Sequence, residues 1–131
     1  MLNMKQPAQH LIYGQIGEDL AAKWLISKGF KVVGRHYLKK CGEIDIVAKK
    51  GNELHFVEVK TTSHVNHETL DGSEPQDNVH FKKKLRLSRV IEIYLEDKGL
   101  DDADFVVDVL CVYLDKQGSV QRFDFIEDIE L

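Results

Sequence analysis

The feature that most constrains the fold is a pair of strand-like segments joined by Gly51-Asn52. Residues 42–50 and 53–62 are rich in β-branched and alternating apolar residues, and the dipeptide between them suits a two-residue hairpin loop. With that loop, Lys50 pairs with Glu53, and every later pair keeps the same sum of positions. The sequence therefore predicts an antiparallel hairpin whose register is fixed residue by residue.

This register predicts which side chains share each face of the hairpin. Going away from the loop, the later pairs include Ala48–His55, Ile46–Val57, Asp45–Glu58 and Glu43–Lys60. Because side chains alternate between the faces of a strand, one face is predicted to be core, carrying Ile44, Ile46, Ala48, Val57 and Val59. The other face carries charged residues and continues into apolar ones: Glu43, Asp45, Glu58 and Lys60, then Val47 and Phe56.

The opposed carboxylates of Asp45 and Glu58 are the anomaly in this hairpin. Directly opposed side chains have Cβ atoms about 4.5–5.5 Å apart, where like charges destabilise a sheet. A hard divalent cation such as Mg²⁺, which takes carboxylate oxygens at about 2.0–2.1 Å, would relieve the repulsion. Lys60 would neutralise part of the charge. The plainer alternative is a solvated strand face on which these acids and the lysine are surface decoration.

The rest of the chain predicts helices packed on a sheet. Apolar spacing predicts a helix over residues 10–28, ended by Gly29, and a second helix over residues 79–97. Strands are predicted over residues 30–38 and 104–114, residues 119–129 can form a last strand, and residues 63–78 are predicted to be a loop. This order favours an α/β fold in a single domain over residues 1–131.

Charge limits the classes of partner that the chain can bind. The net charge is −4 and the pI is near 5.8, which argues against binding nucleic acid over the whole surface. Basic residues nevertheless gather near the start of the second predicted helix, as a nucleic-acid contact or as a solvated helix face: Lys82, Lys83, Lys84, Arg86 and Arg89. Acids collect in the last third of the chain, which leaves a protein-interaction domain as a further hypothesis.

Other features bear on location and on alternative chemistry. No apolar run approaches the roughly 18 residues that a membrane span needs, and the first ten residues lack a secretory pattern. Cys41 and Cys111 lie far apart and are predicted to be reduced, structural thiols in a cytoplasmic protein that does not enter the membrane. His64 and His67 lack cysteine partners at zinc spacing, so they are interpreted as bystanders.

Beyond these patterns, Asp45 followed by Glu58-Val59-Lys60 on the next strand resembles the PD-(D/E)xK motif of the restriction-endonuclease-like nucleases. More closely, the chain resembles the YraN-like family of bacterial proteins. The stretches that carry this resemblance are Gly14-Gln15-Ile16-Gly17-Glu18 with Ala21-Ala22, Gly42-Glu43-Ile44-Asp45-Ile46 and Phe56-Val57-Glu58-Val59-Lys60-Thr61. It covers nearly the whole chain and implies a restriction-endonuclease-like three-layer core, in which a central mixed sheet is flanked by helices.

The same layout is similar to that of archaeal Holliday-junction resolvases, which place a glutamate on the first helix. This likeness implies a catalytic role for Glu18, which the residues alone mark only as an acid near a helix N-terminus. By analogy with resolvases it also implies a homodimer. Together the resemblances imply an endonuclease that depends on Mg²⁺ or Mn²⁺ and acts on DNA, including branched or junction DNA.

The resemblance also implies a role for each matching residue. Asp45 and Glu58 would bind the metal, helped by the backbone carbonyl of Val59. Lys60 would orient the attacking water and stabilise the transition state. Glu18 and Glu43 would complete the surroundings of the metal.

Two positions depart from the family's pattern. Thr62 stands where an arginine usually follows the Lys-Thr pair, and His36 stands where asparagine is common. Neither belongs to the carboxylate and lysine set, but both leave the contacts with a nucleic-acid backbone open. The rival hypothesis is a non-catalytic nucleic-acid-binding module on the same fold, since a fold does not fix a function.

Overall fold

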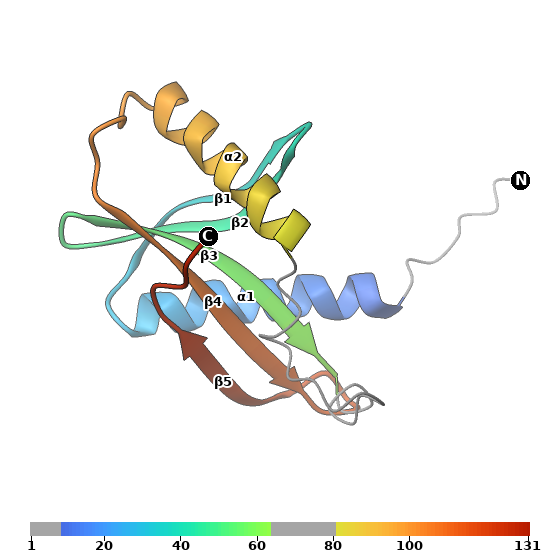
Figure 1. The fold of residues 1–131 in the computed structure, drawn as a ribbon. Helices are drawn as coiled ribbons and strands as arrows, with labels where there is room; N and C mark the ends of the chain where they lie inside the picture. The colour runs from blue at the N-terminus through green and yellow to red at the C-terminus, as the bar shows by residue number, and fades with distance from the viewer. Residues whose placement is uncertain (1–8, 64–80) are drawn as a thin grey trace, which may run out of the picture.

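The computed structural model describes residues 9–63 and 81–131, and within them two helices and five strands form three layers (Figure 1). The helices are α1 (Gln9–Ser27) and α2 (Phe81–Asp97), and the strands are β1 (Lys31–Lys39), β2 (Gly42–Lys50), β3 (Glu53–Thr62), β4 (Phe105–Leu114) and β5 (Val120–Ile126). The predicted helices and strands are thus confirmed, with small differences at their ends. Most of the predicted loop, with His64 and His67, lies outside the described residues.

The strands form one mixed sheet in the order β1-β2-β3-β4-β5. Strands β3 and β4 pair in parallel, and the other neighbours pair antiparallel. Helix α1 lies across one face of the sheet and α2 lies on the other (Figure 1). This arrangement confirms the predicted three-layer α/β fold and is consistent with a restriction-endonuclease-like core.

Both described helices end at a glycine in the left-handed region. At the end of α1, Gly29 has φ +95°, and the amide of Phe30 donates to the carbonyl of Leu25 at 3.0 Å. At the end of α2, Gly99 has φ +65°, and the amide of Leu100 donates to the carbonyl of Leu95 at 2.7 Å. These bonds satisfy carbonyls that a helix end leaves unpaired. Neither helix of the described chain is long and apolar enough to cross a membrane.

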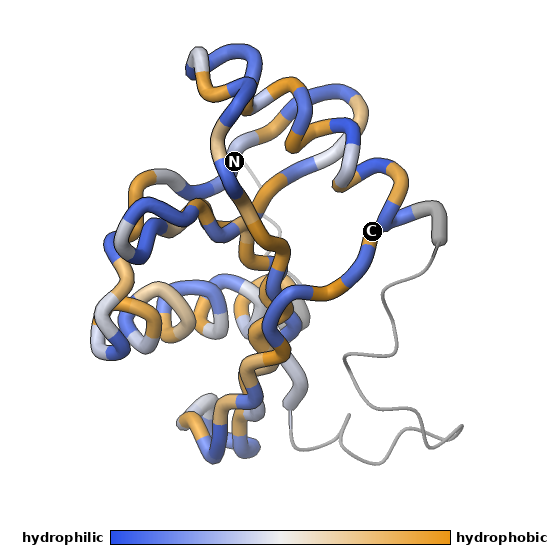
Figure 2. Tube along the Cα trace, turned by 60° about the vertical axis from the view of Figure 1, so that its left-hand side comes forward, coloured by the Kyte–Doolittle hydropathy of each residue, from blue (hydrophilic) through white to orange (hydrophobic). Residues whose placement is uncertain are grey.

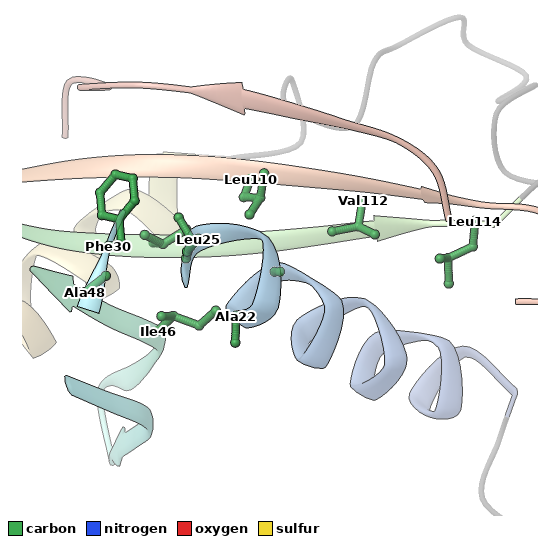
Figure 3. Close-up of a cluster of buried hydrophobic side chains, with 10 residues drawn as sticks. Ala22, Leu25, Phe30, Ile46, Ala48, Leu110, Val112 and Leu114 are labelled. Atoms are coloured by element: carbon green, nitrogen blue, oxygen red, sulfur yellow. The ribbon is translucent and has the colours of Figure 1, made fainter. Parts of the chain in front are cut away.

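Separate apolar clusters hold each helix to the sheet. On the α1 side, Ala22 and Leu25 lie among the strand residues Ile46 and Leu110 (Figure 3). On the α2 side, the buried residues of the helix and of β2 and β3 include Leu87, Val90, Ile91, Tyr94, Val47 and Phe56. Hydrophobic and hydrophilic positions alternate along both helices, as their one-sided burial requires (Figure 2).

The hairpin of β2 and β3 confirms the predicted register from Lys50–Glu53 to Ile46–Val57. The ladder ends there, so the predicted partners Asp45 and Glu58 are not paired through their backbones.

The prediction that Ile44 shares a face with Ile46 is wrong. Ile44 packs in the α2-side cluster, whereas Ile46 packs on the α1 side. On the neighbouring strand, His36 has φ +53°, and the β1–β2 register passes it and Asp45 without a pair. This distortion breaks the alternation of side chains at the point where the charged residues begin.

Candidate active site

Asp45 occupies the end of the β2–β3 ladder. Its Oδ2 accepts a hydrogen bond from the amide of Val59 at 2.9 Å, so a side chain replaces a backbone carbonyl as the acceptor. Burial, and then the nearby charge of Glu58, raise the pKa of Asp45 to about 8, although the Val59 amide acts in the opposite direction. The predicted proximity of Asp45 and Glu58 therefore survives the loss of their backbone pairing.

Glu58 is buried, with 6% of its surface exposed, and its Oε1 forms an ion pair with the Nζ of Lys83 from α2. Lys60 follows on the same strand, is half-buried, and lies beside Lys83. Burial and the neighbouring Lys83 lower the pKa of Lys60. Burial of Lys83 lowers its pKa, but the pairing with Glu58 raises it, and the pKa of Lys83 is raised overall. The site thus gathers two carboxylates and two ammonium groups, of which Glu58 and Lys83 form an ion pair.

Glu18 reaches this region because α1 lies unusually close to β3. A Cβ atom on Gly17 would fall 1.9 Å from Oγ1 of Thr61, so only glycine permits this approach. Glu18 is buried, and its Oε1 lies 3.4 Å from Arg35 and 2.8 Å from Nε2 of His36. Burial raises the pKa of Glu18, against the opposing charges of His36 and Arg35. The structure therefore brings Glu18 near the predicted set, but in contact with basic partners from β1.

His36 links Glu18 to Glu43. Its Nδ1 lies 3.0 Å from Oε1 of Glu43, while its Nε2 faces Glu18. Sequence reasoning noted His36 only as a departure from a family pattern and missed Arg35 altogether. Both residues reach Glu18 because β1 lies next to α1 in the fold. No local sequence pattern reveals that contact.

A pocket of about 440 Å³ opens beside the carboxylates. Its walls are residues 38–43 from the β1–β2 turn, Asp45, Glu58, and the α2 residues Lys83, Arg86 and Leu87. The turn contacts α2 closely, since a Cβ on Gly42 would lie 3.4 Å from the carbonyl oxygen of Arg86. Lys39 and Lys40 enter the pocket wall through this contact, and sequence reasoning did not assign them to the site.

The predicted basic set divides on the structure. Lys83 and Arg86 line the pocket, whereas Lys84 and Arg89 lie elsewhere on α2, half-buried and exposed respectively. The side chain of Lys82 lies outside the described part of the molecule. Thr62, which stands where the family usually has an arginine, is buried on β3 and pairs with Tyr113 of β4.

The donor set for a metal ion is small. Within residues 9–63 and 81–131, no group of three or more histidine, cysteine or carboxylate side chains converges closely enough to hold a metal by itself. The residues present are Asp45 and Glu58, two oxygen donors whose mutual repulsion a cation would relieve. Such a pair fits Mg²⁺ or Mn²⁺, because Mg²⁺ is commonly held by one or two carboxylates, with water and substrate phosphates as the remaining ligands.

Comparison with known proteins places these residues in a family context. Residues 17–127 match the family described as "Uncharacterised protein family UPF0102". A UPF0102 protein from Dictyoglomus turgidum is 37% identical over 113 residues, which cover 86% of this chain and 92% of the relative. One from Moorella thermoacetica is 40% identical over 114 residues, covering 87% and 91%. One from Caldicellulosiruptor bescii is 32% identical over 132 residues, covering 97% and 98%. Glu18, Asp45, Glu58 and Lys60 all lie within the matched region.

Proposed function

The chain belongs to the uncharacterised protein family UPF0102, the YraN-like family that its motifs resemble, and we propose that it is a metal-dependent endonuclease acting on DNA. The observation that carries this proposal is Asp45, a carboxylate placed beside Glu58 at a break in the sheet, with its pKa raised to about 8. A structural role does not require two acids to face each other there. A cation bound between the two carboxylates would explain why they are placed together.

The residues divide the work of phosphodiester hydrolysis between them. Asp45 and Glu58 would hold Mg²⁺ or Mn²⁺, with the carbonyl of Val59 as a further donor. When bound, the metal would lower the pKa of water and take up charge on the phosphate. The ammonium group of Lys60 would donate hydrogen bonds that orient the attacking water and stabilise the transition state. Glu18 and Glu43 would surround the site without touching the reacting atoms.

The basic wall of the pocket supports DNA as the substrate. Lys39, Lys40 and Arg86 bring positive charge from the β1–β2 turn and α2 to the same opening. Phosphate contacts of this kind would supply affinity that falls steeply with salt. Branched or junction DNA and the homodimer remain part of the proposal by resemblance, and the cytoplasmic location remains part of it from the sequence alone.

The test is cleavage of supercoiled plasmid and of a four-way DNA junction by the purified protein with Mg²⁺ or Mn²⁺. Asp45→Asn, Glu58→Gln and Lys60→Met should each abolish cutting, while chelation with EDTA stops the wild type. Asp101→Asn, which alters an exposed acid after α2, is the control and should cut normally. A protein that binds these DNAs without cutting any of them contradicts the enzyme proposal.

One observation favours the second candidate, a non-catalytic nucleic-acid-binding module. Lys83 already neutralises Glu58, so that carboxylate does not need a metal for charge balance. The two candidates differ in the plasmid assay. The binding module would show salt-dependent DNA binding that EDTA leaves unchanged.

A further inference from the structure

Lys83 comes to the site from α2, on the far side of the sheet from α1. Its ammonium group contacts Oε1 of Glu58, which is almost completely withdrawn from water, whereas the Lys83 side chain stays 37% exposed. Sequence reasoning placed Lys83 in a basic run for nucleic acid, without a partner inside the protein. The ion pair gives it a second role, at the carboxylate itself.

The same oxygen cannot serve Lys83 and a divalent cation equally well. A metal ion on Oε1 of Glu58 would lie close to the ammonium group of Lys83, and the two positive charges would repel each other. Lys60, beside Lys83, adds a second positive charge on the same side. Cation binding at the same oxygen of Glu58 would therefore favour movement of Lys83 away from it.

The formal charges show what the movement would achieve. Once Asp45 is ionised, Asp45 and Glu58 carry two negative charges and Lys60 and Lys83 carry two positive charges, so these four residues are balanced without a metal. A divalent cation leaves a positive excess. A phosphodiester anion would restore the balance, which links binding of the cation to binding of the substrate.

The pocket offers a second position for the ammonium group of Lys83. It lines the pocket together with Arg86 and Lys39. A lysine carries its charge on a flexible four-carbon stem, so rotation can carry the ammonium group into the pocket without moving α2. There it would meet the oxygens of a bound phosphate.

We propose that Lys83 exchanges partners, holding Glu58 in the metal-free protein and turning to the substrate phosphate when a divalent cation takes Glu58. This inference rests on the proposed function, because it needs a cation at Asp45 and Glu58. It differs from a permanent structural ion pair in one respect: Lys83 competes with the metal. Removing Lys83 should therefore strengthen cation binding, although it weakens DNA binding.

The experiment is calorimetric titration of the full chain with Mn²⁺ in the absence of DNA. Lys83→Met should bind Mn²⁺ at least about fivefold more tightly than the wild type, since a competing positive charge is gone. Lys83→Arg, which keeps the charge, should stay near the wild type. Lys98→Met, which removes an exposed charge after the end of α2, is the control for net charge and should change little.

Each outcome decides between the claims. Equal or weaker Mn²⁺ binding by Lys83→Met, with binding by the wild type, overturns the partner exchange and leaves the proposed function standing. No Mn²⁺ binding by any variant overturns both. If Lys83→Met fails to fold, Lys83→Gln replaces it, and the wild type gives an independent readout: adding Mg²⁺ should shift the Nζ resonance of Lys83 in an NMR spectrum, and an unchanged resonance on a metal-bound protein contradicts the exchange.

Discussion

Two histidines in this molecule each bridge a pair of carboxylates, and they lie in different surroundings. His36 on β1 places its ring nitrogens 2.8 Å from Glu18 and 3.0 Å from Glu43. His55 on β3 places its ring nitrogens 2.7 Å from Asp108 and 3.2 Å from Glu53. The chemistry is the same in both clusters. Their burial differs, since the His36 side chain is 56% exposed and the His55 side chain is 9% exposed.

The buried cluster around His55 satisfies its own groups. Asp108 is fully buried, accepts from or shares a proton with His55 through Oδ2, and accepts the amide of Asp128 through Oδ1 at 2.9 Å. The amide of Ile129 donates to the carbonyl of Val107 on the same strand at 2.8 Å. These bonds fasten the residues that follow β5 to β4. The cluster is explained by structure alone.

The cluster around His36 borders a carboxylate that the fold does not satisfy in the same way. Beyond Glu18 and Glu43 lies Asp45, which has an amide partner but also faces Glu58. Burial raises the pKa of both Asp45 and Asp108, and at Asp45 the facing charge of Glu58 is the next cause of the rise. A buried acid with hydrogen-bond partners is part of the architecture. An acid held beside another acid is a candidate for function. The contrast between Asp108 and Asp45 is therefore the best guide to where chemistry takes place.

The largest effect on stability is expected from Asp108→Ala. It leaves His55 and the amide of Asp128 without their acceptor in a buried position, and should lower the free energy of unfolding by about 3 kcal/mol. Urea denaturation measures the loss, and hydrogen exchange should show faster exchange at Asp128. Asp101→Ala, at an exposed acid, is the control and should change stability by less than about 0.5 kcal/mol. A loss that small for Asp108→Ala would contradict the claim that Asp108 is a structural acid.

Asp45→Asn should instead raise the free energy of unfolding of the metal-free protein. Asn can still accept the Val59 amide but carries no charge, so the metal-free protein should gain on the order of 2 kcal/mol at pH 8. Because the pKa of Asp45 is raised from 3.8 to about 8, the folded protein keeps a proton that the unfolded chain releases. Stability of the wild type should therefore fall as pH rises from about 4 to about 8.

Unfolding in urea across that pH range, with EDTA present, measures the effect of Asp45. The substitution should flatten the wild-type decline. A variant that loses stability, or keeps the full pH dependence, would show that Asp45 is a structural acid like Asp108.

The backbone of this site was predictable from sequence to a large extent. Gly51-Asn52 fixed the hairpin register, and the alternation of side chains brought Glu58 and Lys60 to the face that carries Phe56, as predicted. Local rules suffice for this because a two-residue turn leaves no freedom in the pairing of the strands that it joins. They fail at Ile44, where the left-handed φ of His36 on another strand interrupts the alternation.

The partners of the predicted residues were much harder to foresee. Lys83 meets Glu58 because α2 packs on the sheet, and Lys40 enters the pocket because the β1–β2 turn contacts α2. The sequence marked both as basic residues, but the contact depends on how a helix packs on a sheet, which is a property of the assembled core. Motifs thus predicted a candidate set of residues, several of which the fold brings together, and left their electrostatic environment to the fold.

Added Mg²⁺ should distinguish the Asp45 region from the His55 cluster through a smaller change in stability. At ten times its dissociation constant, an ion that binds only the folded protein stabilises it by about 1.4 kcal/mol. The wild type should gain this amount in thermal or urea unfolding, and Asp45→Asn should gain nothing. His55→Gln should keep the gain, since its cluster is not the proposed metal site. Stabilisation that survives in Asp45→Asn and disappears in His55→Gln would place the cation at the wrong end of the sheet.

The smallest effect is expected from His36→Asn, and it compares the two histidines directly. His36 is exposed, so its ion pairs are screened by water, and asparagine tolerates the left-handed φ of +53°. The free energy of unfolding should change by less than about 0.5 kcal/mol. The same substitution at His55 removes a buried partner of Asp108 and an edge contact with Phe30, and should cost about 2 kcal/mol. Equal losses at both positions, measured by urea denaturation, would mean that the two clusters share a structural role, because burial is the property on which their distinction depends.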